Sequence, residues 1–168
     1  FQAGADALRK GDLDAAQQAF TESSRANPRM PQPLVGQADV EQRRGNTQAA
    51  KKLLDQALEL APNDAAVLTA RAAFQIRSQD YPAAETELQK AIEVHPDDLR
   101  ARLALAELYA DLVGRPSDAV VAYREALRID PAYSDAKAAL RIVRQAKILA
   151  KLPLLKVSRK NRDAPRGG

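Results

Sequence analysis

The sequence has no cysteine and a single histidine, His95, so it lacks the usual residues of several catalytic and metal sites. The absence of cysteine excludes disulfides, thiolate catalysis and cysteine-ligated metals. One histidine leaves too few nitrogen ligands for a zinc site, and nothing near His95 suggests the nucleophile of a Ser-His-Asp arrangement. We therefore expect no enzymatic activity, no cofactor and no metal.

Long apolar runs, glycine-rich loops and strand patterns are also missing. No stretch of eighteen apolar residues could cross a membrane, and no basic-then-apolar start resembles a signal peptide. The chain has no tryptophan, only 7 glycines and no glycine-rich phosphate loop. Its alanine-rich segments predict an all-α protein. The chain starts at Phe1 without a methionine, which suggests a mature or excised piece.

What the chain does contain is an internal repeat. Residues 65–98 carry two helical patterns that follow Asp64 and Asp80, and Pro96 closes the second. The same proline recurs at successive spacings of 34, 34 and 35 residues: Pro28, Pro62, Pro96 and Pro131. The turn between the two helices recurs in step, at Gly11, Gly45, Gln79 and Gly114. The one extra residue of the fourth copy therefore lies before Gly114, and we expect it to lengthen that turn.

Small and bulky residues repeat in the same register. The small ones, at which two helices can cross closely, are Gly4, Ala38, Ala72 and Ala106 in the first helix, and Ala16, Ala50, Ala84, Ala119, Ser23, Ala57, Ala91 and Ala126 in the second. The bulky ones, which would fill the space between hairpins, are Phe20, Leu54, Leu88 and Tyr123.

This order of small, large and closing proline residues over 34 positions resembles the tetratricopeptide repeat (TPR) family, over about residues 1–150. Gln37 and Arg71 depart from the pattern, since the family usually has leucine there, and Gln79 replaces the usual glycine. The resemblance implies an all-α, right-handed superhelical solenoid of antiparallel helix hairpins, with about nine helices. The predicted domains are a solenoid over 1–151, with repeats at about 1–30, 31–64, 65–98 and 99–133 and a capping helix at about 133–151, then a basic flexible tail or linker over 152–168.

Charge divides the chain into two parts. Residues 137–168 carry ten Lys and Arg and one Asp, whereas residues 1–136 have a net charge of −5. The basic end could meet nucleic acid, an anionic membrane surface or an acidic protein. We favour instead a solvated cap that keeps the solenoid soluble, which is the usual role of a charge run.

The resemblance implies that the first helices of the hairpins line a concave groove. Its candidate residues form rows at repeat spacing, and those predicted to contact a partner are Arg9, Val35, Asp39, Gln42, Arg43, Thr69, Ala73, Ile76, Arg77, Leu103 and Glu107. Arg9, Arg43 and Arg77 form an arginine ladder, which is either solvated or in contact with a ligand. An apolar row beside it suits a peptide with apolar and acidic side chains.

One subclass of the family binds chaperone C-termini through a clamp of lysine, asparagine and arginine side chains. This chain has apolar or small residues at the matching positions: Phe1, Ala5, Gly36, Ala66 and Ala70. Binding of chaperone tails is therefore disfavoured.

Three functions remain. The first is a non-catalytic scaffold that holds a protein or peptide in its groove, as such repeats do in bacterial envelope assembly and secretion, which favours a periplasmic or envelope location over the cytoplasm. The second is an electrostatic adaptor whose basic end docks on nucleic acid or an anionic membrane. The third is the regulatory part of a longer enzyme. Self-association is also possible for such a repeat.

Overall fold

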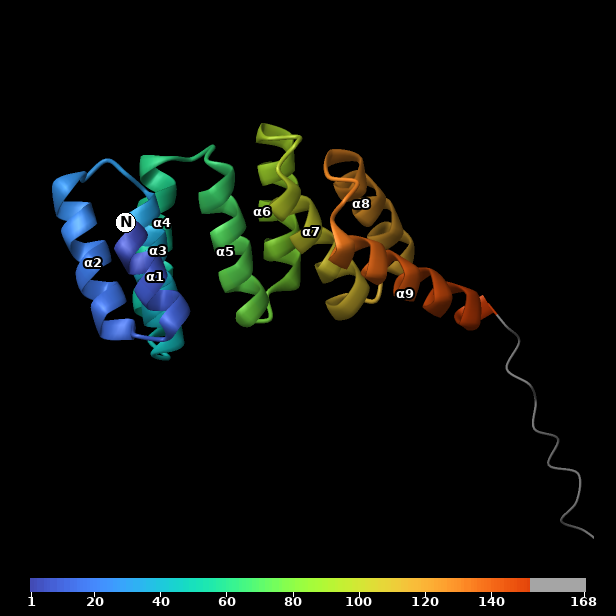
Figure 1. Cartoon of the computed structure of the whole chain (residues 1–168), viewed down its shortest axis with the longest axis horizontal. Helices are drawn as coiled ribbons and strands as arrows, with labels where there is room; N and C mark the ends of the chain where they lie inside the picture. Colours follow the sequence, from blue (N-terminus) through green and yellow to red (C-terminus); the bar gives the residue numbers. More distant parts are fainter. Residues whose placement is uncertain (152–168) are drawn as a thin grey trace, which may run out of the picture.

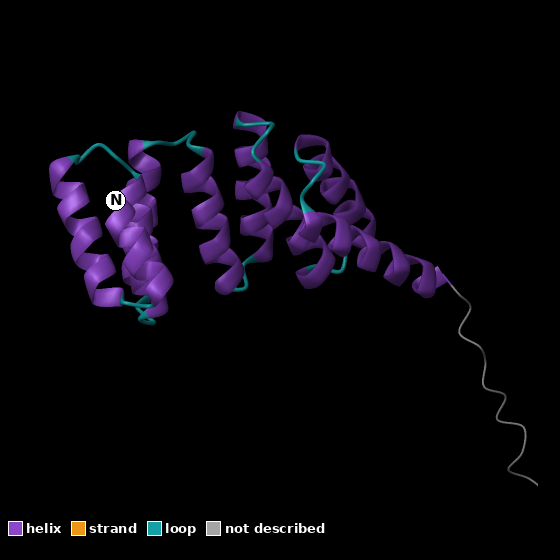
Figure 2. Ribbon diagram, viewed as in Figure 1, coloured by secondary structure: helices purple, strands orange, loops and turns teal. Residues whose placement is uncertain are grey.

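The structure, a computed structural model, describes residues 1–151, and within that range it describes all side chains except those of residue 142 and residues 145–151. The expected basic tail or linker over 152–168 lies outside the described residues. Those that are described form α-helices joined by short loops, with no strand among them (Figure 2). The helices are α1 (Gln2–Lys10), α2 (Leu13–Ala26), α3 (Gln32–Arg43), α4 (Thr47–Leu60), α5 (Ala65–Arg77), α6 (Tyr81–Val94), α7 (Leu99–Glu107), α8 (Pro116–Ile129) and α9 (Ser134–Lys151).

Aspartate side chains fix the starts of several helices, as the sequence predicts. The carboxylate of Asp64 accepts hydrogen bonds from the backbone N–H groups of Ala66 and Val67, at 2.8 and 3.1 Å. Asp12, Asp80 and Asp98 cap α2, α6 and α7 in the same way. Each cap satisfies N–H groups that have no partner inside the helix, so the helix begins at a defined residue.

The hairpins stand side by side in a row, from α1 and α2 at one end to α9 at the other (Figure 1). The two helices of each repeat pack together, and the second helix packs on the first helix of the next repeat. Ala16, Ala50, Ala84 and Ala119 are fully buried, and so is the next row of Ala57, Ala91 and Ala126. The solenoid predicted from the repeat register is thereby confirmed.

The extra residue of the fourth repeat lies inside a helix, so the prediction of a longer turn was wrong. Between α7 and α8, residues Leu108–Leu112 form a π-helical turn, η1. The backbone N–H of Val113 donates to the carbonyl of Leu108 at 3.1 Å, five residues back. A wider helical turn absorbs one inserted residue without breaking the helix. The following loop, residues 113–115, has three residues, like residues 78–80 in the third repeat.

Side chains on and after the π turn tie the third repeat to the fourth. The Tyr109 hydroxyl donates a hydrogen bond of 2.8 Å to Glu85 on α6, and Arg115 also donates to that carboxylate at 2.8 Å. The Arg115 guanidinium stacks 4.4 Å from the centre of the Tyr109 ring. Burial raises the pKa of the Tyr109 hydroxyl, and the hydrogen bond to Glu85 raises it further.

Candidate functional site: the concave groove

The first helices of the hairpins form the inner side of the solenoid. α1 contacts α3, α3 contacts α5 and α5 contacts α7, whereas the second helices α2, α4, α6 and α8 make no comparable contacts with one another. Helices that touch their counterparts in neighbouring repeats lie on the inside of the curve. The groove is therefore built from α1, α3, α5 and α7, as the family resemblance implies.

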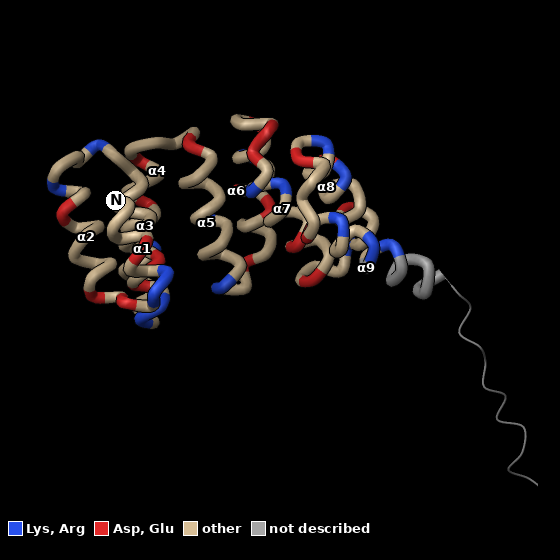
Figure 3. Tube along the Cα trace, in the orientation of Figure 1, with Lys and Arg blue, Asp and Glu red and all other residues tan. Residues whose placement is uncertain are grey.

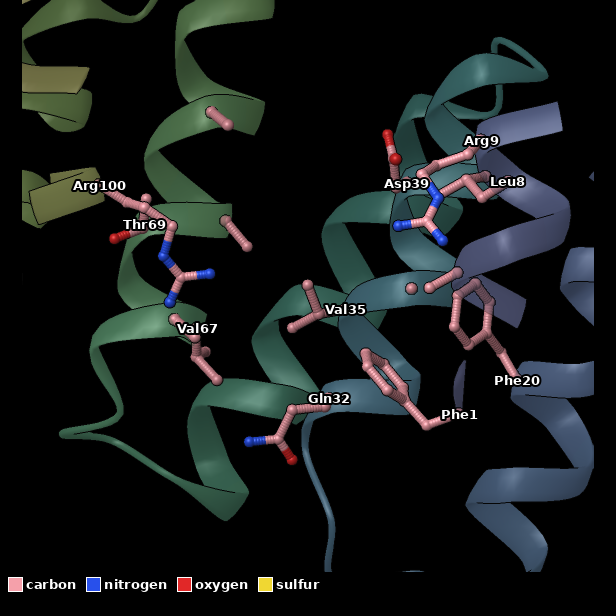
Figure 4. A pocket seen from close by; sticks show the side chains of 15 residues that line it. Phe1, Leu8, Arg9, Phe20, Gln32, Val35, Asp39, Val67, Thr69 and Arg100 are labelled. Carbon is pink, nitrogen blue, oxygen red and sulfur yellow. The ribbon is translucent and has the colours of Figure 1, made fainter. Parts of the chain in front are cut away.

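A cavity of about 660 Å³ opens on this inner side, between α1, α3 and α5 (Figure 4). Its volume lies within the range of roughly 300–1,000 Å³ typical of ligand pockets. Most of its wall is apolar and comes from Phe1, Ala5, Leu8, Val35, Gly36, Ala66, Val67, Ala70 and Ala73. Polar groups at its edge come from Arg9, Gln32, Asp39, Thr69 and Arg100.

Two glycines let the Phe20 ring form the back of this cavity. A Cβ atom on Gly4 would lie 2.7 Å from the ring, and one on Gly36 would lie 2.5 Å from it. Only glycine avoids these clashes, so Phe20 can lie directly against both backbones. The Phe1 ring then packs on Phe20, with 5.6 Å between ring centres.

The cavity continues along the groove into a smaller hollow of about 180 Å³. The two share Val35, Asp39, Ala70 and Ala73, and the second adds Gln42 and Arg77. We call these two connected hollows the trough. Six predicted groove residues line it: Val35, Asp39, Gln42, Thr69, Ala73 and Arg77. Arg9 lines the large cavity as well.

The arginine ladder is already engaged within the protein. Asp39 lies between two of its members and accepts from Arg43 and from Arg77, at 3.2 Å each. Arg43 also donates to the carbonyl oxygen of Leu8 at 3.3 Å, and Arg77 donates to Gln42. These bonds join α3 to α1 and α5, so Arg43 and Arg77 link neighbouring repeats. Arg9 pairs with Asp6 on its own helix, and its side chain is 74% exposed.

Arg43 lines neither hollow, and the other three predicted groove residues lie away from both. Leu103 is buried in the core, and Ile76 packs against the same core. Glu107 lies at the surface of α7, where partial desolvation and the neighbouring Asp111 raise the pKa of its carboxyl. The structure does not bring these three together with the apolar trough.

The groove residues predicted from the sequence did not include the first turns of α3, α5 and α7. Gln32, Ala66 and Arg100 line the cavity, at spacings of 34 residues, and they lie three positions before the predicted row of Val35, Thr69 and Leu103. Their repeat spacing was visible in the sequence. What the sequence could not show is that the open part of the groove is shifted toward the starts of the helices.

The cavity coincides with the positions of the chaperone clamp. All five residues that replace the clamp side chains, Phe1, Ala5, Gly36, Ala66 and Ala70, line it. The place where the clamp subclass has polar groups is therefore an apolar pocket in this chain.

The described part of the chain holds neither a cluster of potential metal ligands nor a membrane-spanning helix. Three or more His, Asp or Glu side chains never gather there in a way that could hold a metal ion. None of the described helices is both long and apolar enough to cross a membrane.

Comparison with known families gives matches to two models described as tetratricopeptide repeat, over residues 7–74 and 75–134. Together they span all four repeats. A comparison with curated protein sequences finds no match.

Solved structures of repeat proteins resemble the fold. The PilF protein of Pseudomonas aeruginosa superposes with a TM-score of 0.77 at 18% identity, over 88% of this chain and 67% of that one. TTC0263, described as a thermophilic TPR protein of Thermus thermophilus, gives 0.75 at 22% identity, over 84% and 78%. The first TPR of Spaghetti (RPAP3), bound to the HSP90 peptide SRMEEVD, gives 0.64 at 18% identity, over 70% and 95%. At these identities the likeness shows the fold alone.

Proposed function

Because the chain belongs to the tetratricopeptide repeat family, we propose that it is a non-catalytic scaffold whose concave groove holds a segment of a partner protein. The observation that carries this proposal is the apolar trough along α1, α3 and α5. A concave, mostly apolar pocket with a few polar groups at its edge is the usual form of a ligand site. The structure of the RPAP3 repeat domain with a peptide shows that such a solenoid can hold one.

Site-specific photo-cross-linking tests this function. A photoreactive amino acid replaces Ala73, which lies in both hollows, or Gln56, which is exposed on the second helix of the second repeat. In the native host cell, we expect the Ala73 position to cross-link to a discrete partner protein and the Gln56 position to give no such product. Cross-links from Gln56 alone would contradict a groove-binding scaffold.

The electrostatic adaptor is a second candidate, supported by the ten basic residues among residues 137–168. Basic positions outnumber acidic ones on the described part of α9, while acidic and basic positions are mixed along the earlier helices (Figure 3). The test replaces Arg159, Lys160 and Arg162 by glutamine in the full chain. A loss of salt-sensitive binding to DNA or to anionic vesicles would favour the adaptor.

The cellular setting belongs to the same proposal. We propose a bacterial periplasm or envelope, and fractionation of the host cell tests it. The sequence of the complete reading frame decides whether the repeats are the regulatory part of a longer enzyme.

A further inference from the structure

We infer that the cavity between α1, α3 and α5 selects an internal protein segment in which one bulky apolar side chain is flanked by acidic residues. This inference rests on the proposed function and names the chemistry of the partner. It concerns the large cavity, and it assigns the main role to Arg9 and Arg100 rather than to Arg43 and Arg77.

The apolar part of the partner follows from the cavity wall. Phe1, Val35 and Val67 line a space that no side chain among the described residues fills (Figure 4). Removing apolar surface from water stabilises a complex by roughly 25 cal/mol per Å². A side chain such as Leu or Phe would gain from this burial, whereas a terminal carboxylate would lose its hydration there.

The acidic part follows from the charges at the edge. Arg9 comes from α1 on one side and Arg100 from α7 on the other, and both guanidinium groups turn toward the cavity (Figure 4). The one carboxylate at the edge, Asp39, is shared by Arg43 and Arg77. Among the residues that line the cavity, two guanidinium groups therefore face one carboxylate that is already shared, and Asp6 and Asp98 lie behind Arg9 and Arg100. Such guanidinium groups favour carboxylates on a ligand.

Arg9 and Arg100 can each leave its present acidic neighbour and bind a ligand at little cost in stability. The Arg9–Asp6 pair is exposed, and exposed ion pairs contribute little to stability. Arg100 lies 3.9 Å from Asp98, which is longer than a hydrogen bond, and the Asp98 carboxylate already caps α7. Both guanidinium groups are thus available to a ligand, whereas Arg43 and Arg77 are held between repeats.

A display library of random twelve-residue peptides, selected on the full chain, provides the probe. We expect enriched peptides to carry a Leu, Ile, Met or aromatic residue with Asp or Glu on both sides. Enrichment of basic or uncharged peptides would overturn the inference, and so would the absence of any enrichment. Tighter binding of a single-stranded oligonucleotide than of any peptide, lost in Arg100→Glu, would also overturn it.

Variants then locate the binding. Arg100→Glu should weaken an enriched peptide roughly tenfold or more, the effect of losing one charge-assisted hydrogen bond. Arg100→Glu should also bind more tightly than the parent protein to a copy of that peptide in which lysine replaces the acidic residues. Arg124→Glu, the same change at an exposed site on α8, should leave binding unchanged. If Arg100→Glu and Arg124→Glu behave alike, the assignment of Arg100 is wrong.

Ala66→Trp separates this inference from the proposed function, because a tryptophan there would occupy the cavity. We expect it to abolish binding of the enriched peptides while the circular dichroism melt stays close to that of the parent protein. If the selected peptides are basic or uncharged and Ala66→Trp no longer binds them, the groove is still the binding site, but the acidic preference is refuted. If Ala66→Trp binds every selected peptide normally, the cavity is not the site. The Ala73 cross-link then decides the scaffold function independently.

Discussion

The first two repeats and the last two bury their helices in different ways. From Ala65 to Val143 one continuous cluster of buried side chains runs through the third and fourth repeats and into α9. The first two repeats have two small clusters instead, one around Phe20 and Val40 and one around Ala50 and Leu54. The open cavity lies where the two halves meet, between Phe20, Gly4 and Gly36 of the first half and the start of α5 in the second.

This difference shows how a repeat can keep its fold and still make a local site. The backbone register is the same in all four copies, and the fully buried alanines hold it. The volume of the inward side chains decides whether the groove is open or filled. Leu103 is buried in the fourth repeat, while Ala5, Gly36, Ala66, Ala70 and Ala73 leave space between α1, α3 and α5. In a solenoid each repeat depends mainly on its neighbours, so one end can change without the other.

The largest expected effect comes from removing Phe20, the one large aromatic side chain buried in the first half. Phe20→Ala should lower the free energy of unfolding by about 3–5 kcal/mol. Because its cluster is separate from the main core, hydrogen exchange should speed up in α1–α3 and change little in α6–α8. The matched variant Leu88→Ala should raise exchange in α5–α8 instead. Equal changes along the whole chain would break the comparison between the halves.

The second prediction concerns Arg71, which lies where the two halves meet. It pairs with Glu87 on α6 at 2.7 Å and with Asp55 on α4 at 3.6 Å. Glu87 is only 15% exposed, so Arg71→Ala would leave a largely buried carboxylate without its partner. We expect a loss of about 2–3 kcal/mol in chemical denaturation, less than for a fully buried pair.

The control for Arg71 is the double variant Arg71→Leu with Glu87→Leu. Replacing both charges with apolar groups removes the unpaired carboxylate, so stability should return to within about 1 kcal/mol of the parent. A double variant as unstable as Arg71→Ala would mean that the ion pair itself, and not the unpaired charge, accounts for the loss.

The backbone was more predictable than the site. The spacing of prolines and turn residues predicts the hairpins, because a pattern that recurs in four copies remains clear when one copy departs from it, as at Gln37. The structure explains that exception, since the Gln37 amide donates to the Thr21 hydroxyl at 3.3 Å across α2 and α3. The sequence also located the inserted residue before Gly114, but repeat spacing alone cannot distinguish a longer loop from a π turn.

The arginine ladder shows why the site was harder. Repeat spacing puts Arg43 and Arg77 in one row, and in the structure Arg77 lines the smaller hollow while Arg43 lies beside it, bonded to Asp39 and to the Leu8 carbonyl. Whether a guanidinium is free depends on which acid lies within about 3–4 Å. Asp39 precedes Arg43 by four residues on α3, so that pair follows from the helix, but Arg77 meets Asp39 only through the packing of α3 against α5. Likewise Arg100 reaches the cavity across a repeat boundary, which no pattern within one helix predicts.

The smallest expected effect is a gain in stability from Gln79→Gly in the third repeat. The corresponding turn residues Gly11, Gly45 and Gly114 all have positive φ, and Gln79 is held at φ 62° as well. A left-handed conformation costs a residue with a side chain roughly 1–2 kcal/mol, which glycine avoids. Glycine loses more backbone freedom on folding, and this offsets about 0.4–1 kcal/mol.

We therefore expect Gln79→Gly to raise the free energy of unfolding by about 0.5–1 kcal/mol. The matched control is Gly45→Ala, since a Cβ there would meet no atom within 4 Å and any loss must come from the backbone conformation at φ 82°. Thermal melts of both variants should shift in opposite directions. A lower midpoint for Gln79→Gly would mean that the glutamine side chain stabilises its turn. The third repeat would then gain stability from the one turn residue at which it departs from the other copies.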